Sequence, residues 1–295
     1  MDIFVSVYWW LWLVSFLLLV VLSVPRRRLI PIASLLVLIA CAWPMVASRT
    51  LWLPAEIEKR PGDVTLVVFN ADMGNKARGQ VLPFVLELEA DIVVVLEPVW
   101  DFYISVTRSH AADTVYPGVL ERVGEGENAR ILVLSRWAIT RFENEPLANP
   151  DGLVCLVHRP EELGGEFVVV AAHPHSPRNP GRWAEGNGSV RRVVGRIDQL
   201  LQEGYTVALG ADLNAPPGSV RDRILRRGVP LVRSKPIIGR WGSYPASLGF
   251  GRIAIDDVWC PPGVVARSWR TIRGPGSDHR AVRAVVSIPG ARDEE

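Results

Sequence analysis

One stretch of the chain decides the fold, Tyr205-Thr-Val-Ala-Leu-Gly-Ala-Asp-Leu-Asn214, which continues into Ala-Pro-Pro-Gly. An apolar run of this length that ends in turn residues is typical of a buried strand. Side chains two positions apart lie on the same side of an extended strand, so Asp212 and Asn214 are predicted to point together out of the sheet edge. Strand ends are where ligands bind in α/β proteins, which makes this pair a candidate site. The alternative is that Asp212 only caps the turn before Pro216.

Several other apolar runs of this 295-residue chain end in polar residues in the same way. Each run is short, rich in β-branched or other apolar residues, and bordered by an acid, an amide or a histidine, which is the pattern of a strand that enters a loop. One such site is easily explained as a turn, but the repeated pattern favours a shared polar site. The candidates are Asn70, Asp72, Glu97, His173, Asp212, Asn214, Asp256, Asp278 and His279.

Strands outnumber helices in the rest of the sequence. We expect one domain over residues 63–288, preceded by a linker at 48–62 and followed by a short tail at 289–295. Helical spacing predicts helices over 80–89, 189–202 and 219–227, and the Pro-, Gly- and Asn-rich segment 177–187 is predicted to be a loop. Arg221 and the other arginines of the third helix are expected to solvate its exposed face. Two packed β-sheets with helices outside fit this pattern better than a doubly wound parallel sheet.

Two apolar runs near the N-terminus, Ile3–Val24 and Leu29–Ala47, are each about long enough to cross a bilayer. A cleaved signal peptide fits less well, because Met1-Asp2 lacks a basic start and a second run follows. Arg26-Arg27-Arg28 lies between the runs, and the positive-inside rule places these arginines in the cytoplasm. We therefore expect a two-pass hairpin of transmembrane helices over residues 1–47 in the cell membrane, with the large domain on the extracytoplasmic side.

Charge and cysteine content give few further constraints. The net charge of +2 indicates no strongly acidic or basic partner, and no protein partner is evident. No two of the three cysteines have the spacing of a metal site. Cys155 and Cys260 are expected to form either one disulfide or two buried free thiols.

The candidate residues are carboxylates, amides and histidines, without a thiolate. Hard oxygen ligands of this kind suit Mg²⁺ or Mn²⁺ better than zinc. Such a site suits phosphoryl transfer, in which a metal neutralises charge on the phosphate and a base prepares a water molecule. A serine hydrolase is disfavoured, because the sequence has no Gly-x-Ser-x-Gly elbow to present a nucleophile.

The same residues, taken in order, resemble a known family. The chain contains Phe69-Asn70-Ala-Asp72, Val95-Leu96-Glu97, Ala172-His173, Gly210-Ala-Asp-Leu-Asn214, Ile255-Asp256-Asp257 and Ser277-Asp278-His279. These motifs resemble the endonuclease/exonuclease/phosphatase superfamily over about residues 64–288, and His173-Pro-His175 resembles its membrane-anchored bacterial branch. The resemblance implies a four-layer α/β sandwich, two β-sheets flanked by helices. The chain departs from the family pattern at Ala211 and at Asp257, a second acid that the resemblance does not explain.

The resemblance also implies a role for each matched residue. Glu97 would be the principal metal ligand, with Asn70, Asp72 and Asp278 near the same ion. Asp212 would orient or deprotonate the attacking water, and Asn214 would position it and bind a phosphate oxygen. His173 would donate to the phosphate, and Asp256 would orient His279.

Together these observations predict a membrane-anchored phosphoesterase that depends on Mg²⁺ or Mn²⁺. Its substrate would be a nucleic acid, a phospholipid head group or a small phosphate ester. The alternative from another class is a non-catalytic binding or scaffold domain of the same fold that is tethered to the lipid bilayer. Loss of Glu97, Asp212 or His279 would favour that alternative, and the sequence retains all three.

Overall fold

The computed structural model describes residues 59–122, 130–142, 152–236, 241–261 and 264–288. The predicted membrane helices, most of the predicted linker and the tail at 289–295 lie outside these residues. Within the described ranges, no helix combines the length and the apolar character that crossing a bilayer requires.

The first of two β-sheets has six strands in the order β11-β12-β1-β2-β4-β3. At its centre β1 and β2 run parallel, whereas each flanking pair is antiparallel. Because β1 and β2 are parallel neighbours, their carboxyl ends lie at the same edge of the sheet. The strands are β1 (Asp63–Asn70), β2 (Ile92–Leu96), β3 (Gly118–Arg122), β4 (Ile131–Ser135), β11 (Val265–Arg273) and β12 (Arg280–Ser287).

The second sheet repeats this plan with the order β5-β6-β7-β8-β10-β9. Its central strands β7 and β8 are again parallel, and their neighbours β6 and β10 are antiparallel to them. The carboxyl ends of β7 and β8 therefore also share one edge. The strands are β5 (Ile139–Arg141), β6 (Gly152–Val157), β7 (Phe167–Ala172), β8 (Val207–Asp212), β9 (Val232–Arg233) and β10 (Asp256–Cys260).

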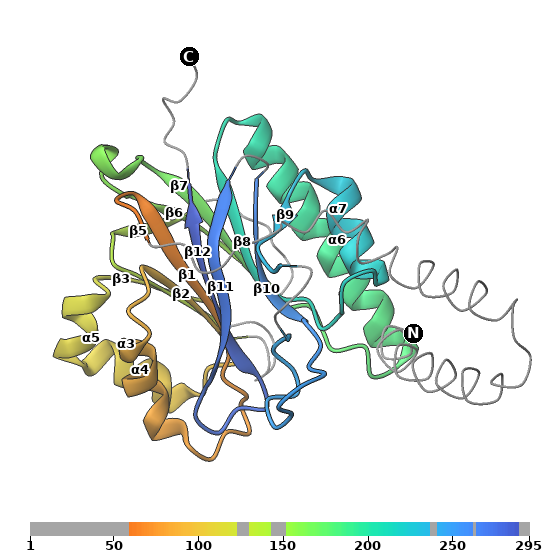
Figure 1. Ribbon diagram of the computed structural model, residues 1–295, viewed down its shortest axis with the longest axis horizontal. Helices are drawn as coiled ribbons and strands as arrows, with labels where there is room; N and C mark the ends of the chain where they lie inside the picture. Colours follow the sequence, from red (N-terminus) through yellow and green to blue (C-terminus); the bar gives the residue numbers. More distant parts are fainter. Residues whose placement is uncertain (1–58, 123–129, 143–151, 237–240, 262–263, 289–295) are drawn as a thin grey trace, which may run out of the picture.

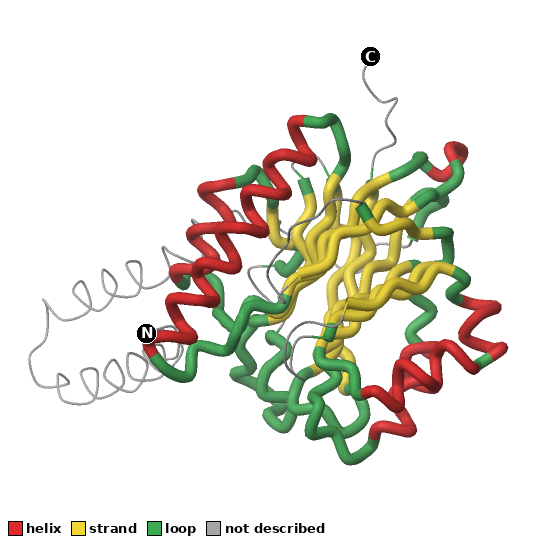
Figure 2. Tube along the Cα trace, turned by 180° about the vertical axis from the view of Figure 1, so that it is seen from behind, coloured by secondary structure: helices red, strands yellow, loops and turns green. Residues whose placement is uncertain are grey.

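The two sheets pack face to face, and helices cover their outer faces (Figures 1 and 2). One apolar cluster fills the space between the sheets, a second joins β7 and β8 to the long helix, and a third lies under the short helices against β1 and β2. The prediction of two packed sheets flanked by helices is confirmed. The helices are η1 (Arg78–Gln80), α3 (Val81–Glu87), α4 (Trp100–Arg108), α5 (His110–Val115), η3 (Glu161–Leu163), α6 (Pro180–Gln202) and α7 (Val220–Gly228).

Gly210, in the stretch quoted first, lies where the two sheets approach each other closely. A Cβ atom at this position would come within 3.0 Å of Val68 in β1 and 3.1 Å of Val94 in β2. Glycine therefore lets β8 approach β1 and β2 just before Asp212. This close approach brings the polar ends of strands from both sheets together.

The predicted loop at 177–187 is wrong from residue 180 onward, because α6 begins at Pro180. Proline is well suited to the first position of a helix, and the side chain of Asn179 caps the helix by accepting a hydrogen bond from the backbone N–H of Arg182. Proline and asparagine were therefore helix-start signals here. The sequence reading also did not predict β3, β5, β9 and β11, which are short or lie at the sheet edges.

The two cysteines of the described domain are free and buried, so the disulfide alternative is excluded. Burial raises the pKa of the Cys155 thiol to about 12. Both thiols are therefore inert packing groups.

Candidate active site

Asn70 joins the ends of three central strands. Its side-chain amide nitrogen donates to Glu97 Oε1 at 3.2 Å and to Asp212 Oδ2 at 3.1 Å. Asn70 ends β1, Glu97 directly follows β2, and Asp212 ends β8, so this one amide connects the two sheets. Two carboxylates are thus held on the two hydrogens of one neutral group.

Short side-chain turns direct the chain away from these strand ends. The backbone N–H of Asn214 donates to Asp212 Oδ1 at 2.7 Å, and that of Asp72 donates to Asn70 Oδ1 at 3.0 Å. Asp72, Glu97 and Asn214 have left-handed φ values of 56°, 50° and 50°. Such values are uncommon outside glycine and tend to occur at functional sites.

Asp212 and Asn214 were predicted to point together because both would lie on one strand. This reason is wrong, because β8 ends at Asp212 and Asn214 lies beyond it. The turn nevertheless directs both side chains toward His173. Nε2 of His173 lies 3.2 Å from Asn214 Nδ2, 3.6 Å from Asp212 Oδ2 and 3.4 Å from Glu97 Oε1. The pair therefore converges on a residue that follows β7.

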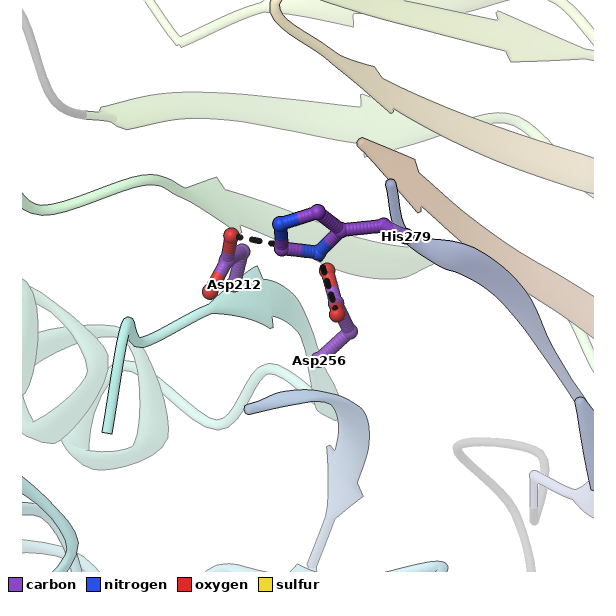
Figure 3. A group of neighbouring side chains, drawn as sticks. All are labelled: Asp212, Asp256 and His279. Atoms are coloured by element: carbon purple, nitrogen blue, oxygen red, sulfur yellow. Dashed lines mark hydrogen bonds and ion pairs between the residues drawn. The ribbon is translucent and has the colours of Figure 1, made fainter. Parts of the chain in front are cut away.

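His279 and Asp256 form a second part of the site (Figure 3). His279 Nδ1 lies 2.8 Å from Asp256 Oδ2 and 3.7 Å from Asp212 Oδ2. Burial alone would lower the pKa of His279, but the carboxylates of Asp256, Asp212 and Asp278 raise it to about 10. Burial also raises the pKa of Asp256, so the proton between Asp256 and His279 belongs to the buried pair as a whole.

Ser277 fixes the loop that carries His279, a function that sequence reasoning missed. Its hydroxyl donates to the backbone carbonyl of Asn70 at 2.7 Å and accepts from the backbone N–H of His279 at 3.0 Å. The only sequence signal was its place in the triplet Ser277-Asp278-His279. This serine connects the last strand to the end of β1.

The candidates divide between the wall of an open cleft and the layer behind it. Asn70, Asp72, Glu97, Asn214, Asp278 and His279 line the cleft. Asp212 and Asp256 are fully buried behind this wall, and His173 is nearly so. The side chain of Asp278 is 58 % exposed and lies at the rim, 3.8 Å from His279. All nine predicted residues thus belong to one connected region.

Other residues of the cleft were not predicted from the sequence. Tyr244, with its ring centroid 4.9 Å from that of His279, lines the cleft together with Ile253. Ser176, Pro177 and Arg178 contribute from the loop after β7. These residues lie in loops without strand-end patterns, so only the fold brings them to the site.

The donor chemistry of the site fits a divalent cation. Carboxylates outnumber cationic groups along the cleft, and in the described part of the chain Glu97 and Asp212 have histidine rather than lysine or arginine as their ion-pair partner. Asp212, Asp256 and His279 offer ligand atoms within 4.8 Å of one another. His279 Nδ1 is already hydrogen-bonded to Asp256, however, so the carboxylates facing the cleft are the better ligands.

A sequence profile of the Endonuclease/Exonuclease/phosphatase family matches residues 67–279, from the second half of β1 to His279. The chain belongs to this family. The match includes all nine candidate residues, from Asn70 to His279. No curated protein sequence matched the chain.

Solved structures with this family's fold resemble the chain at low sequence identity. A mannosyl-6-phosphatase of Bacteroides thetaiotaomicron has a TM-score of 0.58 at 14 % identity, over 76 % of this chain and 99 % of its own. TDP2 of D. rerio in complex with a single-strand DNA product has 0.57 at 15 %, over 76 % and 98 %. Sphingomyelinase C of Streptomyces griseocarneus has 0.55 at 16 %, over 76 % and 99 %. At these identities the likeness establishes the fold.

Proposed function

We propose that this chain is a membrane-anchored, divalent-metal-dependent phosphoesterase that hydrolyses its substrate by in-line attack of an activated water. One observation carries the proposal: the Asn70 amide holds the carboxylates of Glu97 and Asp212 together beside an open cleft. Family membership supports the same class of reaction, since endonucleases, exonucleases and phosphatases all cleave phosphoester bonds.

Glu97 is the group best placed to hold the metal. It lines the cleft, its side chain is 24 % exposed, and Asp72 and Asp278 line the same cleft. The NH₂ group of Asn70 donates to the two acids and its Oδ1 accepts from the backbone N–H of Asp72, so in this orientation it positions ligands rather than acting as one. A bound Mg²⁺ or Mn²⁺ would supply neutralisation of charge on the phosphate oxygens.

The remaining residues supply proton transfer and hydrogen bonds. Asp212 orients or deprotonates the water, because it is an acid that, among the described residues, forms ion pairs with the two histidines and with no lysine or arginine. Asn214, which lines the cleft, donates to a phosphate oxygen. His173 lies behind Asn214 and stabilises the negative charge that develops on the same phosphate. Asp256 binds Nδ1 of His279 and so keeps the ring in one orientation, in which Nε2 of His279 is available to a substrate in the cleft.

The substrate class that we propose is a nucleic acid, a phospholipid head group or a small phosphate ester. The three solved structures named above include a sugar phosphatase, a protein bound to a DNA product and a sphingomyelinase.

The bilayer anchor rests on the apolar runs at residues 3–24 and 29–47. A reporter that is active only outside the cytoplasm, fused to the C-terminus, tests the proposed topology; a silent reporter contradicts it.

The decisive experiment assays the purified full chain against plasmid DNA, RNA, phospholipid vesicles, p-nitrophenyl phosphate and bis-p-nitrophenyl phosphate. Each assay is run with Mg²⁺, with Mn²⁺ and with EDTA. Turnover that requires metal supports the proposal, and the best substrate defines the subclass. Absence of both turnover and Mn²⁺ binding in the folded protein would instead favour the scaffold alternative.

A further inference from the structure

Arg221 is a fully buried arginine directly behind the candidate site. It lies in the first turn of α7 and has no exposed surface, contrary to the expectation that it solvates the helix. Its Nη1 donates to the carbonyl of Leu213 at 2.7 Å, and its Nη2 donates to the carbonyl of His175 at 2.8 Å. Burying a guanidinium is costly, so these contacts call for an explanation.

The two carbonyls belong to the two loops that carry candidate catalytic side chains. Leu213 lies between Asp212 and Asn214, and His175 is two residues after His173. These loops also meet at the site itself, where Asn214 Nδ2 lies 3.1 Å from the carbonyl of Pro174 and 3.2 Å from His173 Nε2. One planar cation therefore connects the loop after β7 to the loop after β8.

Helix α6 leaves room for this cation at Gly186. A Cβ atom at that position would lie 2.1 Å from Arg221 Nη2 and 3.0 Å from the carbonyl of His175. Glycine in a helix interior is unfavourable relative to alanine, so the close approach of the guanidinium gives a reason for it here. The neighbouring Asn187 contacts Arg221 Nε through Oδ1 at 3.4 Å.

We propose that Arg221 is a positioning residue that holds His173 and Asn214 in register for the reaction. The rigid fork of a guanidinium reaches two carbonyls at once, whereas a lysine ammonium has no such fixed geometry. The catalytic part of this inference rests on the proposed phosphoesterase function. The connection between the two loops is independent of it.

The chain offers a matched control in Arg159, which is also buried and also donates to backbone carbonyls. Its guanidinium contacts the carbonyls of Gly62, Gly165 and Ile288, and Gly164 makes room for it as Gly186 does for Arg221. Gly62 precedes β1 and Ile288 follows β12, so this arginine lies at the end of the domain away from the candidate site.

The test compares Arg221→Lys with Arg159→Lys in the full chain, without added metal, by hydrogen–deuterium exchange. Arg221→Lys is expected to speed exchange of the Leu213 and Asn214 amides about 10-fold or more, because local opening becomes easier. Both amides are hydrogen-bonded in the intact loop, to Ile255 and to Asp212. Arg159→Lys leaves these amides at the wild-type rate. Wild-type exchange of these amides in Arg221→Lys overturns the proposal.

Turnover of bis-p-nitrophenyl phosphate with Mn²⁺ then tests the catalytic consequence. Arg221→Lys should lower kcat roughly 100-fold with little change in KM, since small misplacements of reacting groups have effects of this size. Arg159→Lys should keep kcat. Equal losses in the two variants overturn the positioning role. If wild-type protein has no turnover, the proposed function fails, and the exchange result alone decides whether Arg221 connects the loops.

A second pair of variants keeps Arg221 and changes a glycine of α6 instead. Gly186→Ala adds a Cβ that collides with the guanidinium, whereas Gly195→Ala adds one with no atom within 4 Å on the same helix. Gly186→Ala should reproduce both the faster exchange and the lower kcat, and Gly195→Ala should change neither. Wild-type behaviour of Gly186→Ala would contradict the proposal.

Discussion

Asp256 and Asp257 are neighbours in β10, yet they belong to two buried polar clusters of opposite character. Asp256 contacts His279 in the cleft cluster, which also contains Glu97 and Asp212. Asp257 lies in what we call the buried network, made of Asp222, Arg226, Arg233, Lys235 and Asp257.

The two clusters differ in charge balance and in access. In the buried network two acids face three basic groups, and Asp257 Oδ1 also accepts hydrogen bonds from Trp269 at 2.9 Å and from Ser234 at 3.1 Å. None of its members lines the cleft. The cleft cluster has an excess of acids, an exit to solvent and left-handed backbone at its strand ends. Acids in excess beside a cleft therefore indicate a site, whereas buried acids that each face a basic group indicate structure.

Substituting one acid from each cluster separates these roles, and the largest effect is expected in the cleft. Asp212→Asn should lower turnover by about 10²- to 10⁴-fold, because the amide neither accepts the proton of the attacking water nor carries its charge. The measurement is kcat for bis-p-nitrophenyl phosphate with Mn²⁺, together with circular dichroism to establish that the variant is folded. Turnover near the wild-type level would remove Asp212 from the mechanism.

Asp257→Asn should have the converse effect, on stability rather than on turnover. The change removes the acid that faces Lys235 and leaves Arg233 with only the more distant Asp222, at a cost of about 3 kcal/mol in the free energy of unfolding. Urea denaturation monitors the loss, and the folded fraction should retain wild-type kcat. A variant that is stable but inactive would assign Asp257 to the site and contradict the division into two clusters.

A divalent cation should stabilise the folded protein by binding at the cleft cluster and not at the buried network. Mg²⁺ at 100 times its dissociation constant is expected to raise the free energy of unfolding by about 2.7 kcal/mol, because it binds the folded state. Thermal scans with Mg²⁺ and with EDTA measure this difference. Glu97→Gln should abolish it and Glu166→Gln, an exposed acid away from the cleft, should not. The lack of a Mg²⁺ effect on the wild type would contradict a metal site at Glu97.

Lys235 gives the buried network a pH dependence of its own. Burial lowers its pKa to about 8, and Asp257 opposes that shift while Arg233 adds to it. Between about pH 8 and the ordinary pKa of lysine, near 10.5, the unfolded chain binds more protons than the folded one, so this residue makes stability rise with pH.

Lys235→Met removes that contribution and is expected to stabilise the protein at pH 7 on the order of 2 kcal/mol. The difference in free energy of unfolding between wild type and variant, measured from pH 7 to 10.5, should shrink as pH rises. His279, with its pKa raised to about 10, contributes stability that is lost as the pH rises through that value. The comparison with the variant is needed because this loss is common to both proteins and cancels in the difference. A constant difference would mean that Lys235 does not titrate in this window.

The sequence by itself predicted much of this arrangement. The runs that form β2 and β7 are apolar along their whole length, and those of β1 and β8 are largely apolar, so burial on both faces is readable from composition alone. The polar residues at their ends are equally visible, and all nine candidates lie in one region. Their individual catalytic roles stay predictions.

Only the tertiary structure decided which buried charges belong together. The family resemblance assigned Asp256 to His279, but the sequence could not show what Asp257 contacts or that Arg221 is buried, because their partners, Arg233 and His175, lie on distant segments. Local periodicity reports how one element is buried and says nothing of which charge faces it from another element. The pairing of buried charges is a property of the packed sheets and helices, and that pairing is what distinguishes the buried network from the candidate site.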